Sequence, residues 1–199
     1  MEIRSFLALK LPPEIKKTLS HILREMKKTP LDVRWVKADN IHITMVFLGN
    51  VPVEDVERMG ESAEKVCQQY GPFAISLRGA GVFSSRRNPR VLWAGMEGDI
   101  DRMTCFRDVL QRHLKPFGIK QEKRPFRPHL TIGRFRKGAR PGNDLDDLLT
   151  EYQDLSGPVY ALKELVLFKS DLKPGGPVYS ELKAWPLIGD FNGQSEAIH

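Results

Sequence analysis

The 199-residue chain contains only two cysteines and no long run of apolar residues. A helix that spans a membrane needs at least ~18 consecutive apolar residues, so we expect no such helix and no membrane partner. Cys67 and Cys105 lack Cys-x-x-Cys spacing and fall in expected helices, which favours packed thiols over a disulfide, a metal site or a nucleophile. The first residues lack the basic start and long apolar segment of a secretory signal. These absences predict a cytoplasmic protein.

The chain also lacks a glycine-rich phosphate loop, a known RNA-binding signature and the closely spaced histidines of metal hydrolases, so we expect neither a metal nor a cofactor. Positive charge, in contrast, is in excess, and the formal net charge of +6 favours polyanionic partners without identifying one. Basic side chains gather in two stretches: Arg86, Arg87 and Arg90 in the first, and Lys120, Lys123, Arg124, Arg127, Arg134, Arg136, Lys137 and Arg140 in the second. RNA or a nucleotide is the expected partner, and a plain solvated surface is the alternative.

The motif His-x-Thr occurs twice, at His42 to Thr44 and at His129 to Thr131, each time inside a strand-like run. Residues two apart in a strand point to the same face, so each strand presents an imidazole beside a hydroxyl. Two such strands facing each other would form a pocket that suits a bound phosphate and an acid–base pair. A single His-x-Thr is common and means little by itself. Its duplication in matched surroundings is what indicates a site.

Both motifs stand at the centre of the same order of elements, strand–helix–strand–helix–strand. The expected elements are strands at 3–9 and 73–83 with helices from Pro13 and over 53–69 in the first half, and strands at 91–94 and 159–169 with helices from 99–101 and over 144–152 in the second. We therefore expect one bilobal domain over residues 1–187, built from two pseudo-repeats at about 1–88 and 89–187. Residues 188–199 are polar and are expected to form a disordered tail.

The paired motifs resemble those of the two-histidine phosphoesterases. Their extended forms, 42–49 and 127–134, are most similar to the RNA 2′,3′-cyclic phosphodiesterase branch, once named 2′-5′ RNA ligases. The stretches 4–9, 81–83, 164–172 and 176–179 are also similar to that branch. The resemblance implies an α+β fold with two pseudo-symmetric lobes, each with an antiparallel sheet that lines a central groove and with helices outside. It also implies metal-free hydrolysis of a terminal 2′,3′-cyclic phosphate in RNA to a 2′-phosphomonoester.

The resemblance assigns roles to the four motif residues. His42 is the general acid that protonates the leaving 3′ oxygen, and His129 is the general base that activates water; the near symmetry of the motifs leaves the reverse order open. Thr44 and Thr131 hold the nonbridging phosphate oxygens. An imidazole with an ordinary pKa near ~6.5 can serve as either acid or base at working pH, which makes chemical sense of the pair.

Phe47 and Arg134 match positions that approach the base or the ribose in the family, and they offer a stacking face and a cation. The alternatives are a core aromatic for Phe47 and a surface salt bridge for Arg134. The other histidines, His21, His113 and His199, are expected on helix or tail surfaces.

The expected activity is that of an RNA 2′,3′-cyclic 3′-phosphodiesterase acting on RNA ends or nucleotides that carry the cyclic phosphate, with weak reverse 2′-5′ RNA ligation at the same site. We expect the chain to act as a monomer. The alternative is a non-catalytic RNA- or nucleotide-binding module that uses the same groove. The natural RNA substrate is left open, as is the use of 2′-5′ oligonucleotides or ADP-ribose cyclic phosphates.

Overall fold

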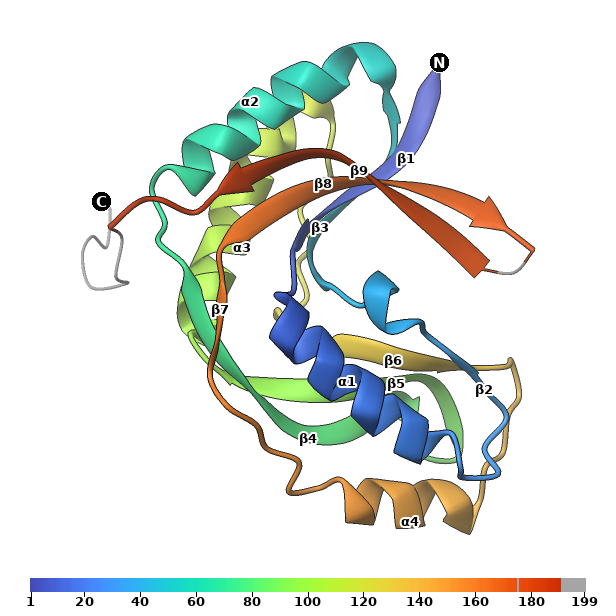
Figure 1. The fold of residues 1–199 in the computed structure, drawn as a ribbon. Coiled ribbons are helices and arrows are strands. Elements are labelled where there is room, and N and C mark those ends of the chain that lie inside the picture. Colours follow the sequence, from blue (N-terminus) through green and yellow to red (C-terminus); the bar gives the residue numbers. More distant parts are fainter. Residues whose placement is uncertain (175, 191–199) are drawn as a thin grey trace.

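Two antiparallel sheets face each other in the computed structural model, which describes residues 1–174 and 176–190 (Figure 1). The first sheet has the order β3 (Ile43–Pro52), β1 (Glu2–Leu9), β8 (Glu164–Lys173), β9 (Gly176–Pro186). The second has the order β2 (Val33–Trp35), β6 (Leu130–Phe135), β5 (Asn88–Gly98), β4 (Phe73–Ser85), β7 (Tyr160–Leu162). The predicted α+β class with two lobes, each containing an antiparallel sheet, is confirmed.

The four α-helices of the described residues divide between the two sheets. Helices α2 (Val56–Cys67) and α3 (Ile100–Leu114) pack on each other and lie against the first sheet. Helices α1 (Pro13–Met26) and α4 (Asn143–Glu151) lie with the second sheet, where the hydroxyls of Thr18 in α1 and Tyr160 in β7 are hydrogen-bonded at 2.9 Å. Three short 3₁₀ helices, η1 (Ala38–Asn40), η2 (Val53–Asp55) and η3 (Lys115–Phe117), connect these elements.

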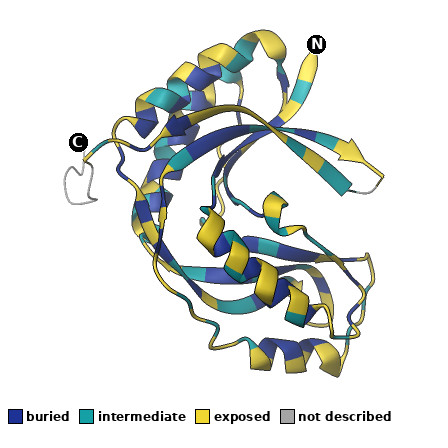
Figure 2. Cartoon of the chain, viewed as in Figure 1, coloured by how far each residue is buried: buried dark blue, intermediate teal, exposed yellow. Residues whose placement is uncertain are grey.

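The helices follow from their apolar spacing. Helix α1 begins at Pro13, whose missing N–H would be unpaired in a first turn anyway, and its buried stripe is Ile15, Leu19, Ile22, Leu23 and Met26. Helix α3 buries the same kind of stripe, with Met103, Phe106, Leu110 and Leu114 fully enclosed. Each such side chain contributes about 1.5–3 kcal/mol relative to leaving it in water. The buried faces turn towards the sheets in both lobes (Figure 2).

Each lobe contains strands and helices from both halves of the sequence. Strands β1 and β3 of the first half pair with β8 of the second, while β5 and β6 of the second half pair with β4 of the first. The order β3-β1-β8 in one sheet therefore matches β6-β5-β4 in the other, and the helices divide in the same way. The boundary between two pseudo-repeats near residues 88 and 89 stays a prediction, and a lobe is not one half of the chain. The exchange brings the two histidine-bearing strands to corresponding positions in facing sheets.

One predicted strand is wrong. The segment 159–169 is divided after Leu162 into β7, which joins the second sheet, and β8, which joins the first. Both pieces are apolar and strand-like, so the sequence pattern alone does not reveal that the chain passes from one sheet to the other between them.

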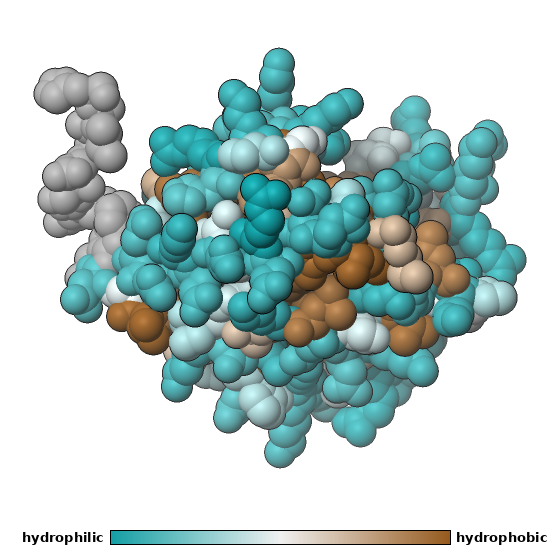
Figure 3. Space-filling model, turned by 90° about the horizontal axis from the view of Figure 1, so that it is seen from above, coloured by the Kyte–Doolittle hydropathy of each residue, from teal (hydrophilic) through white to brown (hydrophobic). Residues whose placement is uncertain are grey.

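The cysteine prediction holds for one thiol only. Cys67 at the end of α2 is buried, and burial raises its pKa to about 12, whereas Cys105 in α3 is exposed and is not a packed thiol. Across residues 1–174 and 176–190, no helix is long and apolar enough to cross a bilayer. The face of the molecule seen from above is mostly hydrophilic, with apolar side chains exposed between the polar ones (Figure 3).

The start of the predicted tail is hydrogen-bonded to the end of α2 and the turn that follows it. The backbone N–H of Ile188 donates to the carbonyl of Cys67 at 3.4 Å, and that of Gly189 donates to the carbonyl of Tyr70 at 3.1 Å. The rest of the tail prediction, residues 191–199, and the surface placement of His199 lie outside the described residues.

Candidate active site

The two motif histidines are held in the same way. His42 Nδ1 lies 2.8 Å from the carbonyl oxygen of Asn40, and His129 Nδ1 lies 2.8 Å from that of Arg127. A carbonyl oxygen can only accept a hydrogen bond, so each Nδ1 carries the hydrogen and donates it. This fixes both rings and leaves both Nε2 atoms for a substrate. Each Nε2 can take up a proton when its ring is neutral and give one up when its ring is charged.

Thr44 and Thr131 follow the two histidines at the same spacing. Thr44 in β3 and Thr131 in β6 are half-buried and share the face of their histidine by strand alternation. Within the described part of the chain, neither hydroxyl is hydrogen-bonded to a protein group. Each hydroxyl is therefore able to donate to an oxygen of a bound anion.

One extra residue in β3 and one in β6 place Phe47 and Arg134 on the same faces of their strands as the two histidines. In β3 the register with β1 passes from Ala8–Thr44 to Leu7–Val46, so that Met45 is an extra residue. In β6 the register with β5 passes from Trp93–Thr131 to Leu92–Gly133, so that Ile132 is an extra residue. An extra residue shifts the alternation by one. The residue five positions after each histidine, Phe47 or Arg134, therefore shares its face instead of entering the core.

Neither alternative proposed for these two residues holds. Phe47 is 70% exposed, so it is not a core aromatic, and its ring centroid lies 6.2 Å from that of Phe6. Arg134 has no ion pair with any described residue, so it is not part of a surface salt bridge. Burial lowers the pKa values of His42 and His129, and the positive charge of Arg134 adds to that lowering at both histidines.

Three rings that sequence reasoning assigned no role surround His42. Phe6 stacks on its imidazole at 4.7 Å, Phe168 stacks at 5.8 Å, and Tyr179 meets it edge-on at 5.2 Å. Phe6 is buried without belonging to the central hydrophobic core. The signal that could have found them is the resemblance in 4–9, 164–172 and 176–179, which contain these three aromatics. Among the described residues, His129 has a single ring neighbour, Phe83, in edge-on contact at 4.6 Å.

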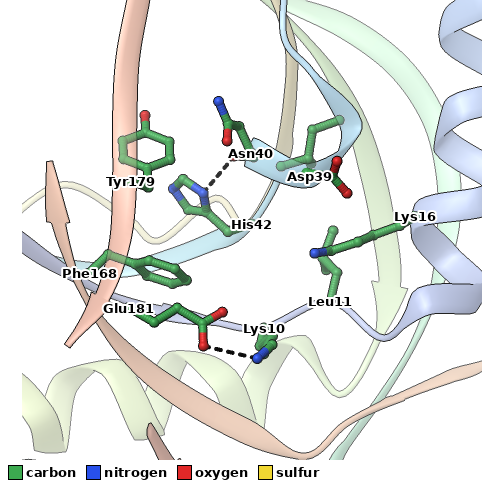
Figure 4. Close-up of a pocket in the computed structure, with 10 residues that line it drawn as sticks. Lys10, Leu11, Lys16, Asp39, Asn40, His42, Phe168, Tyr179 and Glu181 are labelled. Atoms are coloured by element: carbon green, nitrogen blue, oxygen red, sulfur yellow. Dashed lines mark hydrogen bonds and ion pairs between the residues drawn. The ribbon is translucent and has the colours of Figure 1, made fainter. Parts of the chain in front are cut away.

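His42 lines a cavity of about 300 Å³ between β8, β9 and the start of α1 (Figure 4). Its imidazole points into the space between Tyr179, Phe168 and Asn40, and Lys16 reaches in from α1. Glu181 accepts a hydrogen bond from Lys10 at 3.0 Å across the lower wall. The cavity is thus aromatic on one side and carries charges of both signs on the other.

Burial lowers the pKa of both histidines. The pKa of His42 falls from 6.5 to about 4, first because the ring is enclosed and then because Arg134, His129 and Lys16 add positive charge, while the bond to Asn40 opposes the change. The pKa of His129 is lowered by burial and by Arg134, and its bond to Arg127 opposes the change. Both rings therefore favour the neutral form until a negative charge enters the site.

The basic stretches divide between the surface and a second cavity. Arg124 pairs with Glu122 and Arg136 pairs with Asp32 at 3.5 Å, so these charges are already balanced. Arg86, Arg87 and Arg140 line a separate cavity of about 610 Å³, in which Arg86 pairs with Asp146 at 2.9 Å.

The remaining described histidines lie outside the site. His21 is exposed, as predicted for a surface residue, whereas His113 is half-buried. In the described ranges, no three His, Cys, Asp or Glu side chains lie together as a metal would need.

Comparisons with known proteins agree with the paired motifs. The chain matches the model of the LigT-like phosphoesterases over residues 9–93 and 97–179. It is 35% identical to the RNA 2′,3′-cyclic phosphodiesterase of Methanothermobacter thermautotrophicus, over 94% of this chain and 100% of that protein. It is 32% identical to the protein of the same name from Thermotoga maritima, over 90% of this chain and 93% of that protein.

Solved structures agree as well. A Thermus thermophilus protein superposes with a TM-score of 0.78 at 25% identity, over 94% of this chain and 100% of that chain. Escherichia coli LigT complexed with 3′-AMP superposes with a TM-score of 0.73 at 28% identity, over 94% of this chain and 99% of that chain. The family match covers most of the sequence and includes both His-x-Thr motifs, so the resemblance is confirmed. The chain belongs to the LigT-like phosphoesterase family.

Proposed function

We propose that this chain is an RNA 2′,3′-cyclic 3′-phosphodiesterase that hydrolyses terminal 2′,3′-cyclic phosphates to 2′-phosphomonoesters without a metal. The observation that carries the proposal is the pair of histidines with equivalent Nδ1 bonds and available Nε2 atoms. The relatives named RNA 2′,3′-cyclic phosphodiesterase support the choice of substrate.

The reaction adds one water across one P–O bond. In the proposed order, His129 Nε2 takes a proton from water as the water oxygen bonds to phosphorus. The bond from phosphorus to the 3′ oxygen breaks, and His42 Nε2 gives its proton to that oxygen. Thr44 and Thr131 donate to the nonbridging oxygens, whose negative charge grows in the transition state. Phe47 and Arg134 take the base and ribose side of the terminal nucleotide.

This order requires the substrate to restore the proton on His42. With a pKa of about 4, His42 is neutral in the free protein at neutral pH. The negative charge of the bound phosphate favours the imidazolium and raises that pKa. The deeper enclosure of His42 favours the reverse order, in which the less enclosed His129 is the acid and His42 the base.

Leaving-group chemistry distinguishes the two orders. A nitrophenyl phosphodiester releases a stable phenolate that needs little help from an acid, so the variant that lacks the general acid should lose much less activity on this ester than on a cyclic phosphate. If His42→Ala is rescued in this way and His129→Ala is not, His42 is the acid. The opposite pattern establishes the reverse order, and rescue of neither would contradict a separate acid and base.

The product of an RNA oligonucleotide that ends in a 2′,3′-cyclic phosphate tests the function itself. A 2′-phosphomonoester, formed at the same rate with and without EDTA, is the expected result. A 3′-phosphomonoester would overturn the proposed regiochemistry, and loss of activity in EDTA with recovery in a divalent ion would overturn the metal-free reaction. Binding without turnover would favour the alternative, a non-catalytic RNA- or nucleotide-binding module.

The same proposal includes the setting of the enzyme. The reverse reaction, 2′-5′ ligation, uses the same groups and is weak because water is the more abundant nucleophile. The chain is also proposed to act as a monomer. It is proposed to work in the cytoplasm, where thiols such as Cys67 and Cys105 stay reduced.

A further inference from the structure

Two arginines stand directly opposite each other where β2 pairs with β6. The register of this antiparallel ladder is Val33–Phe135, Arg34–Arg134 and Trp35–Gly133. Residues directly opposite share a face with their β-carbons roughly 4.5–5.5 Å apart, and like charges in this position repel. Neither guanidinium has an acidic partner among residues 1–174 and 176–190.

At another opposed position of the same two segments, an arginine faces an acidic residue instead of a second arginine. Just beyond the ladder, Arg136 is opposed by Asp32, and the two form an ion pair at 3.5 Å. The chain therefore balances one arginine of this segment with a carboxylate and opposes the next with a second arginine. A repulsive pair that persists on an exposed face is suited to an anion that neutralises both members.

The arginine pair faces the catalytic side of the second sheet. The extra residue Ile132 places Arg134 on the same face of β6 as Thr131, and Arg34 shares that face because it is directly opposite. The charge of Arg134 also contributes to lowering the pKa values of both histidines. Arg34 also reaches the other lobe, since its Nη1 lies 4.0 Å from the position that a β-carbon on Gly176 would occupy. Gly176 begins β9 of the first sheet. The pair therefore lies between the lobes, on the face of the second sheet that carries Thr131.

The position of Arg134 along β6 indicates which anion the arginine pair binds. Arg134 is three residues beyond Thr131 on the same face of β6, so the arginine pair lies further along the strand than the phosphate that Thr131 is proposed to hold. The ribose of the terminal nucleotide carries the next phosphate of an RNA chain on its 5′ carbon. An arginine beside that ribose is therefore also close to the next phosphate.

We propose that Arg34 and Arg134 together bind the phosphodiester that joins the terminal nucleotide to the one before it. This subsite rests on the proposed function and makes short RNA ends better substrates than cyclic mononucleotides. Two guanidiniums supply the planar, paired donors that match the oxygens of a phosphodiester.

Three substrates and two variants test the pair. The substrates are a cyclic mononucleotide with a free 5′ hydroxyl, a dinucleotide ending in the same cyclic phosphate, and that dinucleotide with an uncharged methylphosphonate linkage. The variants are Arg34→Gln and, as the matched control, Arg136→Gln, which removes an arginine that Asp32 already neutralises. Wild-type turnover of the mononucleotide reports on the proposed function, and the effect of the linkage charge reports on the subsite.

Arg34→Gln should lower kcat/KM for the charged dinucleotide about tenfold more than for the methylphosphonate analogue, mainly through KM, the scale of one lost charge-assisted contact. It should also reduce by about one the slope of the logarithm of the dinucleotide binding constant against the logarithm of the salt concentration. Because it relieves a repulsion, its melting temperature should equal or exceed that of wild type. Arg136→Gln should show none of these changes in substrate preference.

Equal effects of Arg34→Gln on charged and uncharged linkages, or no effect on either, would overturn the subsite. If wild type turns over none of the substrates, the proposed function fails and binding decides the subsite alone. Wild type should then bind the charged dinucleotide about tenfold more tightly than its methylphosphonate analogue, with the difference lost in Arg34→Gln. The absence of any such difference in wild type would contradict the arginine pair.

Discussion

The two halves of the site share their hydrogen bonding and differ in their enclosure. His42 and His129 each donate from Nδ1 to the carbonyl two residues before, at 2.8 Å in both cases. Within the part of the chain that the structure describes, however, His42 contacts three aromatic rings, whereas His129 contacts Phe83 alone. The repeated part supplies what the proposed acid and base both need, a fixed ring and an available Nε2. The part that differs separates their affinities for the proton, which an acid–base pair also needs.

The largest effect should come from removing either imidazole. His42→Ala and His129→Ala should each lower turnover of a cyclic phosphate by roughly a hundredfold or more, the usual scale for a positioned acid or base. The double variant should be far less than multiplicatively worse, because the pair acts as a unit. Steady-state kinetics on a cyclic mononucleotide measures all three, and His21→Ala on the exposed face of α1 is the matched control. Near-wild-type turnover in a folded single variant would contradict the assignment.

The threonines test whether the two halves contribute equally to phosphate binding. Thr44→Val and Thr131→Val keep the shape of the side chain and remove its hydroxyl, so each should lose a hydrogen bond to a charged oxygen, about 1.5–3 kcal/mol. The loss should appear in kcat for a cyclic mononucleotide. Thr104→Val, whose hydroxyl bonds only to the carbonyl of Ile100 within α3, is the control. A loss confined to one threonine would show that one lobe alone holds the phosphate.

Much of this arrangement follows from sequence spacing, because it depends on local periodicity. The helices α1 and α3 begin where Pro13 and the acids near Asp99 predict, and the pairing of histidine with threonine follows from alternation in a strand. Contacts between distant segments could not be predicted in this way. The rings of Phe168 and Tyr179 reach His42 only because β8 and β9 join the sheet of β1 and β3.

The faces on which Phe47 and Arg134 lie could also not be predicted from strand alternation, although they depend on neighbouring residues of one strand. Strict alternation from His42 or His129 places the fifth following residue on the opposite face. The extra residues Met45 and Ile132 reverse that placement in both strands, and single residues of ordinary β-propensity carry no sequence signal for a bulge. The resemblance to relatives identified these two positions where periodicity would have placed them in the core.

Substitution of the neighbouring rings Phe47 and Phe6 should affect different properties, substrate binding for Phe47 and stability for Phe6. Phe47→Ala should weaken a substrate that carries a base by about 1–3 kcal/mol, the scale of one lost stacking contact. Its free energy of unfolding should change by less than about 0.5 kcal/mol, because the ring is 70% exposed. Phe6→Ala should instead destabilise the fold by about 3–5 kcal/mol, because Phe6 is 3% exposed. Denaturant unfolding and the KM values for nucleotide substrates check both, and a large loss of stability in Phe47→Ala would contradict the binding role.

The smallest expected effect comes from removing one of the aromatic rings that enclose His42. Phe168→Leu removes a ring that stacks on the imidazole and admits water, so it should raise the pKa of His42 from about 4 towards 6.5. A rise of one unit corresponds to about 1.4 kcal/mol. Because the folded pKa lies below the unfolded one, the unfolded chain takes up the proton first as the pH falls. Stability present above pH 6.5 is therefore lost towards pH 4, and the variant should lose less of it.

The same variant shows which limb of the pH profile of kcat/KM belongs to which histidine. The profile of kcat/KM reports the pKa values of the free enzyme, and the group with the lower pKa sets the acidic limb whether it is the acid or the base. The enclosed His42, with a pKa of about 4, should therefore set the acidic limb, and Phe168→Leu should move that limb to higher pH. Phe83→Leu beside His129 should move the alkaline limb, and NMR titration of the two imidazoles should show which pKa each substitution changes. If both substitutions moved the same limb, the different enclosures of the two histidines would not be what separates their pKa values.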